Sequence, residues 1–165
     1  MNTNTLSIAE FNSNSKLSNW QIVNDVVMGG RSESGFYLNE EGNAVFKGYV
    51  SLENNGGFSM VKNIFPTIEV NEFSKILLKI KGDGKRYQFR VKSNTNESHS
   101  YVSHFLTSGE WQIIEISLSD LYPTFRGRKL SIPNYPGQLL EEVAILIGNK
   151  KTESFKLEIK WISLK

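Results

Sequence analysis

Histidines, carboxylates and hydroxyls are the side chains of this sequence that could carry chemistry, and their spacing favours no reaction. His99 and His104 are five residues apart on or beside one expected strand, so they would project to opposite faces and make a poor metal pair. The sequence has no cysteine, which excludes thiolate chemistry and disulfides. No loop of regularly spaced aspartates supplies a calcium cage, although Asp25 or Asp83 with backbone carbonyls leaves a looser calcium loop open. We expect no metal site and no cofactor.

Other short motifs match catalytic sequences only in part. Ser13-Asn14-Ser15-Lys16 has the Ser-x-x-Lys pattern, but the companion motifs of those enzymes are missing. Gly82-Asp83-Gly84-Lys85 lacks the spacing of a phosphate loop, so we interpret it as a tight turn. Glycoside hydrolysis needs two carboxylates held about 5–10 Å apart, and no spacing rule places Asp25, Glu53 and Asp83 on one face. We therefore expect a protein without catalytic residues.

The most distinctive stretch of the chain runs from Trp20 to Ser34. Its β-branched start leads to Asn24-Asp25, whose side chains can hydrogen-bond the nearby backbone and bend the chain. The pair Gly29-Gly30 permits positive φ, so the backbone can turn tightly there. Arg31-Ser32 could then present backbone N–H groups and a guanidinium to an anion, or the turn could simply let two strands pack closely. We interpret the stretch as a strand, a bend and a glycine turn at an edge that faces a ligand or partner.

Short β-rich segments separated by Gly and Asn turns predict an antiparallel protein of nine or ten strands. The expected strands include residues 36–38, 44–52, 58–61, 76–81, 86–92, 101–106, 111–118, 143–147 and 155–161, and residues 6–8 offer one edge strand. Residues 76–81 and 86–92 alternate apolar and charged side chains around Gly82-Asp83-Gly84, so we expect them to form a hairpin. We expect residues 101–106 and 111–118 to form a second pair.

The stretch from Asp120 to Gln138 holds three of the four prolines and the basic run Arg126-Gly127-Arg128-Lys129. Because proline cannot donate to a strand ladder, we expect a long loop that crosses the surface, and such loops are often functional. A helical turn is expected at Leu139-Leu140-Glu141-Glu142. The long crossover suits a Greek-key connection between sheets better than a meander.

The predicted fold class is all-β: a jelly-roll sandwich of two antiparallel sheets with little helix. The 165 residues are within the usual size of one domain, which we expect to span residues 1–165.

Charge and hydropathy bear on the partners. The net charge of +2 is too small to imply a nucleic-acid partner, and the lysines are interpreted as solvent-facing strand residues. No apolar run approaches the roughly 20 residues needed to span a bilayer. The first residues lack the pattern of a secretory signal and the arginines of a mitochondrial transit peptide, so we expect a cytoplasmic protein.

Tyrosines and tryptophans are more numerous than one small core needs with their polar tips unsatisfied. The group comprises Tyr37, Tyr49, Tyr101, Trp111, Tyr122 and Tyr135. Because these side chains offer rigid contact area together with a hydrogen bond, we expect some of them to face a concave surface or a partner.

A set of short motifs follows one another in order between about residue 8 and residue 165. It comprises Trp20, residues 24–32, Phe46-Lys47-Gly48, Asn55-Gly56-Gly57-Phe58, residues 81–87, Trp111, residues 125–128 and residues 155–162. This set resembles the complex I intermediate-associated protein 30 family. The resemblance implies a galactose-binding-like sandwich, the fold that several carbohydrate-binding modules also use. Mitochondrial members of the family help to assemble respiratory NADH:ubiquinone oxidoreductase.

Two binding functions follow from these observations. In the first, the chain binds a protein partner, such as a subunit or intermediate of a respiratory complex, through a rim formed by its turn-rich segments. In the alternative, a concave sheet face lined by aromatics such as Tyr101 and Trp111 binds a glycan. The candidate binding residues are Asn24, Asp25, Arg31, Asn54, Asn55, Arg86, Tyr101, Trp111, Arg126 and Arg128.

Overall fold

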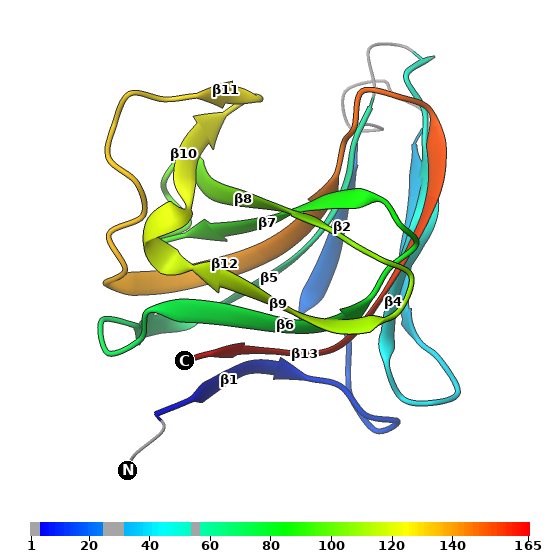
Figure 1. Ribbon diagram of the computed structural model, residues 1–165, viewed down its shortest axis with the longest axis horizontal. Helices are drawn as coiled ribbons and strands as arrows, with labels where there is room; N and C mark the ends of the chain where they lie inside the picture. The colour runs from blue at the N-terminus through cyan, green and yellow to red at the C-terminus, as the bar shows by residue number, and fades with distance from the viewer. Residues whose placement is uncertain (1–3, 25–31, 54–56) are drawn as a thin grey trace.

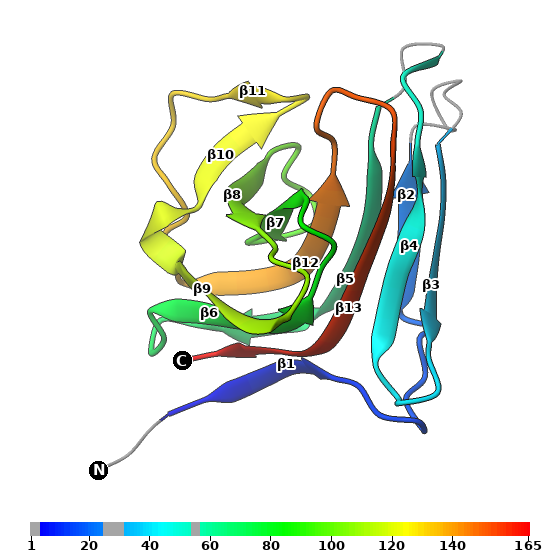
Figure 2. The same ribbon diagram turned by 45° about the vertical axis from the view of Figure 1, so that its right-hand side comes forward.

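Alternating side chains place the strands in two antiparallel sheets that pack face to face, as the computed structural model shows (Figures 1 and 2). The structure describes residues 4–24, 32–53 and 57–165. The expected all-β jelly-roll sandwich is confirmed, and Leu118–Asp120 form a short 3₁₀ turn.

Sheet A has six strands in the order β3-β4-β13-β6-β9, with β1 also paired to β13. Their bounds are β1 Leu6–Glu10, β3 Glu33–Leu38, β4 Ala44–Val50, β6 Lys75–Lys81, β9 Trp111–Ser117 and β13 Glu153–Leu164. Sheet B has seven strands in the order β11-β10-β8-β7-β12-β5-β2. Their bounds are β2 Trp20–Asn24, β5 Ser59–Glu69, β7 Arg86–Lys92, β8 Ser100–Leu106, β10 Tyr122–Phe125, β11 Arg128–Lys129 and β12 Leu139–Ile147.

The core lies between the inner faces of the two sheets and follows from the period of two. On β7, for example, Tyr87, Phe89 and Val91 are buried while the residues between them reach the outer face. Phe46 of β4 and Phe155 of β13 pack in the same core with ring centroids 4.8 Å apart and ring planes tilted by 60°. Each such side chain contributes about 1.5–3 kcal/mol when it is fully buried.

Both expected hairpins, residues 76–92 and 101–118, are wrong. β6 belongs to sheet A and β7 to sheet B, and β8 and β9 are divided in the same way. The actual neighbours are β6 with β9 and β7 with β8. In a sandwich, a strand buries its apolar face whether the next strand lies beside it or opposite it. Alternation therefore predicts the buried face but not the hydrogen-bonded neighbour.

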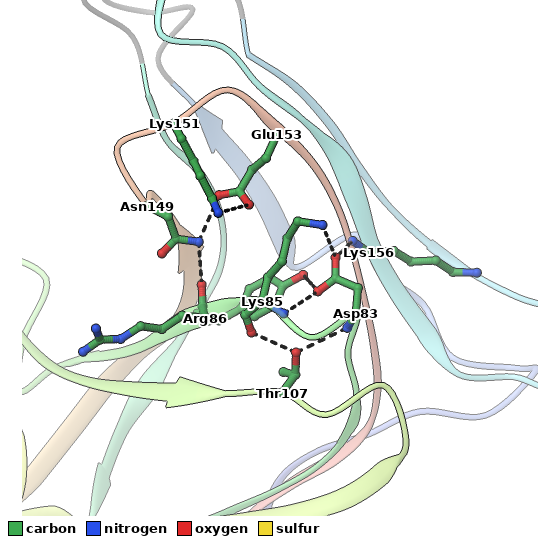
Figure 3. A network of polar contacts seen from close by, with 9 residues as sticks. Asp83, Lys85, Arg86, Thr107, Asn149, Lys151, Glu153 and Lys156 are labelled. Carbon is green, nitrogen blue, oxygen red and sulfur yellow. Dashed lines mark hydrogen bonds and ion pairs between the residues drawn. The ribbon is translucent and has the colours of Figure 1, made fainter.

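Two connections that cross between the sheets, residues 82–85 and 107–110, lie against each other (Figure 3). The Thr107 hydroxyl donates to the Lys85 carbonyl over 2.8 Å and accepts from the Asp83 N–H over 3.3 Å. A Cβ on Gly82 would lie 2.2 Å from the Thr107 Cβ, so only glycine fits there. The two crossings thus form one packed unit.

The stretch from 120 to 138, expected to be a loop, contains a small hairpin instead. β10 pairs with β8, and Pro123 lies opposite Tyr101. The Pro123 carbonyl accepts a hydrogen bond from the Leu130 N–H over 2.9 Å, so the proline withholds only its own N–H from the pairing. Arg126 and Gly127 connect β10 to β11 with φ of 51° and 78°, the positive pair of a type I′ turn.

The helical turn expected at Leu139–Glu142 is also wrong, because these residues begin β12. This strand lies between β5 and β7 and pairs with both, so its neighbours impose the extended form on these four residues. A bulge falls between Leu140 and Glu142 opposite β5. The edge strand expected at residues 6–8 forms as β1.

Candidate functional site

One end of the sandwich carries the segments that flank the two turn-rich loops. Asn24, the last residue of β2, pairs with Ser59 at the start of β5. The Ser51 N–H donates to the Ser32 hydroxyl over 3.0 Å, and the Ser59 hydroxyl donates to that of Ser34 over 2.5 Å. The expected rim residues Asp25, Arg31, Asn54 and Asn55 lie outside the described residues. The structure therefore brings together the flanks of both loops at one end.

A polar network continues this end toward sheet B (Figure 3). The Asn149 side chain donates to the Arg86 carbonyl over 3.1 Å and to the Glu153 carboxylate over 3.0 Å. Lys151 lies 3.9 Å from the same carboxylate. We call this end the rim and define it by Asn24, Ser32, Arg86, Asn149 and Glu153. Arg86, a predicted site residue, is thus part of it.

Asp83 has a structural role next to the rim. Its carboxylate accepts from the Tyr87 hydroxyl over 3.0 Å and from the Lys156 N–H over 2.8 Å. The Lys85 ammonium lies 3.7 Å away. Burial raises the pKa of Tyr87, and the Asp83 charge raises it further. Both carboxylate oxygens are engaged by protein donors, so Asp83 holds a sheet crossing to β13. Within the described ranges, no three His, Cys, Asp or Glu residues gather as a metal site.

The outer face of sheet B collects positive charge. The cationic face, as we call it, comprises Lys62 of β5, Arg86, Arg90 and Lys92 of β7, and Lys129 of β11. Arg90 lies at its centre, between Val102 of β8 and Ala144 of β12, which are both buried. Glu142 brings a negative charge to the same face and lies 3.9 Å from the Lys62 ammonium.

Polar contacts around Arg90 hold the middle of the cationic face. The Arg90 guanidinium donates to the Gln88 side-chain oxygen over 2.9 Å. Next to it, His104 Nε2 lies 2.8 Å from the Tyr122 hydroxyl, and the Lys129 ammonium lies 5.4 Å from the centre of the Tyr122 ring. Burial lowers the pKa of His104, and Arg86 and Arg90 lower it further. His104 is therefore held in its neutral form at pH 7.

The predicted aromatic pair Tyr101 and Trp111 is not brought together. Tyr101 points into the core from β8 of sheet B, where its ring lies 5.3 Å from that of Tyr135 and its hydroxyl 3.1 Å from His99. Trp111 lies on β9 of sheet A, because the crossing at residues 107–110 separates the two strands. Tyr37 on β3 and Tyr49 on β4 are exposed, also on sheet A.

Arg126 and Arg128 lie on the β10–β11 hairpin at the end of sheet B away from the rim (Figure 2). The register shows this, because Thr124 lies opposite Ser100 at the start of β8 whereas Arg86 lies opposite Leu106 at its end. The hairpin arginines and the rim thus border the cationic face from opposite ends.

Comparison with known proteins agrees with this architecture. The family described as complex I intermediate-associated protein 30 (CIA30) matches residues 9–159. The chain belongs to this family. No curated protein matches the chain in a sequence search.

Solved structures show the same fold in carbohydrate-binding modules. The family 11 module of a cellulosomal cellulase of Clostridium thermocellum is 14% identical with a TM-score of 0.71, and the match covers 99% of this chain and 95% of that one. The same kind of module in complex with a β-1,3-1,4-mixed-linked tetrasaccharide is 16% identical with a TM-score of 0.67, covering 94% and 96%. A family 4 module is 12% identical with a TM-score of 0.56, covering 96% and 97%. For this CIA30 member, these likenesses establish the fold.

Sequence reasoning missed the centre of the cationic face. Arg90, Gln88 and His104 were not among the predicted site residues. The alternation of Arg86, Gln88, Arg90 and Lys92 was a usable signal, since it places all four side chains on one face of β7. What alternation lacked was the neighbouring strands, which supply His104 and Lys62 through long-range pairing. None of the helices formed by the described residues has the length and apolar character to cross a membrane.

Proposed function

We propose that this CIA30 member is a non-catalytic binding module that holds a protein partner through its rim and the adjoining outer face of sheet B. Family membership supports the protein partner, because the family is described by its association with complex I intermediates. In this proposal, the partner is a subunit or an assembly intermediate of a respiratory complex.

The observation that carries the proposal is the convergence of charged residues around one sheet face. Arg86 at the rim and Arg126 and Arg128 on the hairpin border the cationic face from its two ends. Internal hydrogen bonds already fix the backbone of the rim, as with Asn149, which donates to the Arg86 carbonyl and to the Glu153 carboxylate. A surface whose backbone is ordered before binding loses less conformational freedom when the partner arrives, and this favours affinity.

Quantitative affinity capture tests this proposal. The wild-type chain and the variants Asp25→Ala, Arg86→Ala and Arg126→Ala are immobilised and exposed to a lysate of the source organism, and the captured proteins are compared by mass spectrometry. Lys47→Ala is the matched control, because Lys47 is exposed on β4 of the opposite sheet. We expect the three site variants to lose the same partner and the control to retain it. An identical set of partners for all variants would place the site elsewhere.

A glycan is the second candidate ligand, and the likeness to a family 11 module solved with a tetrasaccharide favours it. A glycan array and titration with mixed-linked β-glucan oligosaccharides separate the two candidates. Binding of a neutral oligosaccharide that Gln88→Ala abolishes would support the glycan. A blank array would exclude this candidate.

A further inference from the structure

Arg90 has more hydrogen-bonding capacity than the protein uses. A guanidinium carries five N–H groups in a planar fork, and the structure shows one of these nitrogens donating to Gln88. The side chain stands between the buried residues Val102 and Ala144, which offer it no polar partner. The carboxylate that acts on the pKa of Arg90 is that of Glu142 on β12, which lies beside Lys62. Among the residues that the structure describes, the remaining N–H groups of this half-buried guanidinium thus find no hydrogen-bond acceptor.

The charge around Arg90 is predominantly of one sign. Lys92, Arg86, Lys62 and Lys129 share the cationic face, with Glu142 as the acidic counterpart among its described residues. The outer face of sheet A also carries cations. There, Lys75 forms an ion pair with Glu115 and Lys81 lies opposite Glu158, whereas Lys47 lies opposite Lys156. What distinguishes sheet B is a half-buried arginine at the centre of its cations, because the described strands of sheet A carry lysines and no arginine.

We propose that this face binds an extended acidic segment of the protein partner, with one of its carboxylates held by the Arg90 guanidinium. This inference rests on the proposed function and names the chemistry of the partner. Arginine pairs with carboxylates in a bidentate way, and such charged hydrogen bonds are about twice as strong as neutral ones. Arg86 at the rim and Lys129 on the hairpin then meet acidic residues at the two ends of the segment.

The dimensions of the face suit a short extended peptide. β8 runs seven residues from Ser100 near the hairpin to Leu106 near the rim. At about 3.3 Å per residue this is about 23 Å, so a peptide of about seven residues spans the face.

The contacts that Tyr122 already makes within the protein favour a peptide ligand over a sugar. Sugars commonly bind on the open face of an aromatic ring, but the Lys129 ammonium lies over the Tyr122 ring. The Tyr122 hydroxyl is also engaged, by His104. The centre of the face therefore presents positive charge and hydrogen-bond donors rather than a stacking platform.

Fluorescence anisotropy with defined peptides tests the inference. The probe is a labelled seven-residue peptide of alternating glutamate and serine, and the control peptide has glutamine in place of each glutamate. We expect the wild-type chain to bind the glutamate peptide in preference, with an affinity that falls as salt rises. Arg90→Gln should weaken binding at least about tenfold, which corresponds to about 1.4 kcal/mol. Arg90→Lys should recover part of the loss, and Lys47→Gln on sheet A should bind like the wild type.

Thermal unfolding of each variant separates lost binding from lost folding. If Arg90→Gln does not fold, Lys92→Gln and Lys129→Gln replace it, and each should weaken binding severalfold. Equal binding of the two peptides, or unchanged binding by the folded variants, would overturn the inference. Preferential binding of an oligogalacturonate with no binding of the glutamate peptide would also overturn it. If the Arg90→Gln variant captures the same partner from lysate as the wild type does, the inference is refuted and the proposed function is retained. If the wild-type chain captures no partner, the proposed function itself is refuted.

Discussion

Replacing Gly82 by alanine tests the contact between the two crossings from sheet to sheet. The new Cβ would lie 2.2 Å from the Thr107 Cβ and 2.3 Å from its hydroxyl oxygen, so the backbone of one crossing must move. Forced overpacking of this kind costs about 1–3 kcal/mol. The movement also weakens the hydrogen bonds that join Thr107 to Lys85 and Asp83, at about 1 kcal/mol in total. We expect the free energy of unfolding to fall by about 2–4 kcal/mol, which lowers Tm by about 5–15 °C in a chain of this size.

Urea titration followed by tryptophan fluorescence, together with calorimetry, measures this loss. Gly35→Ala is the control, because a Cβ there meets nothing within 4 Å. It should change stability by less than about 0.5 kcal/mol. Adding Thr107→Gly to Gly82→Ala removes the clash, so the double variant should lose less stability than the sum of the two single variants. A Gly82→Ala protein as stable as the wild type would refute the packing of the two crossings.

Three further variants test the core and its polar contacts. Tyr87→Phe removes the buried hydroxyl that donates to Asp83 and should cost about 1.5–3 kcal/mol in urea unfolding, with an unchanged result counting against the bond. Phe46→Ala empties the space beside the Phe155 ring and should cost about 3–5 kcal/mol in the same assay; a loss below 1 kcal/mol would contradict full burial. The pKa of His104 is lower in the folded chain than the value of about 6.5 expected when unfolded, so the unfolded state binds its proton more tightly. The stability that depends on neutral His104 is complete above about pH 6.5 and is lost as the pH falls toward the folded pKa of His104. If this assignment holds, His104→Gln should flatten the dependence of the free energy of unfolding on pH between pH 7 and pH 5.

The buried faces could be predicted from the sequence, whereas the neighbouring strands could not. Alternation correctly places Ile76, Leu78 and Ile80 in the core, because a strand has only two faces and the apolar one is buried. The choice between a hairpin and a crossing depends on Gly82 and Thr107, which are 25 residues apart in sequence and meet only in the folded state. Long-range packing of this kind leaves no local pattern.

The candidate site was predictable to a similar extent. The structure places the flanks of the two expected rim segments at one end, where Asn24 pairs with Ser59, whereas residues 25–31 and 54–56 lie outside the described residues. The pairing of Tyr101 with Trp111 failed because the crossing between them changes sheets. Arg90 gains its significance from Val102 and Ala144 on the strands at either side, and only the register of three strands reveals these neighbours.

The central place of β13 in sheet A has a consequence for synthesis on the ribosome. This strand follows every other strand along the chain, yet it pairs with β1, β4 and β6. Until its residues emerge from the exit tunnel, β4 and β6 keep an unsatisfied edge and an uncovered apolar surface. Nascent chains in that state are prone to aggregate, and chaperones that bind exposed apolar strands would recognise them. Sheet A therefore closes only after translation has passed residue 153, however early the other strands are made.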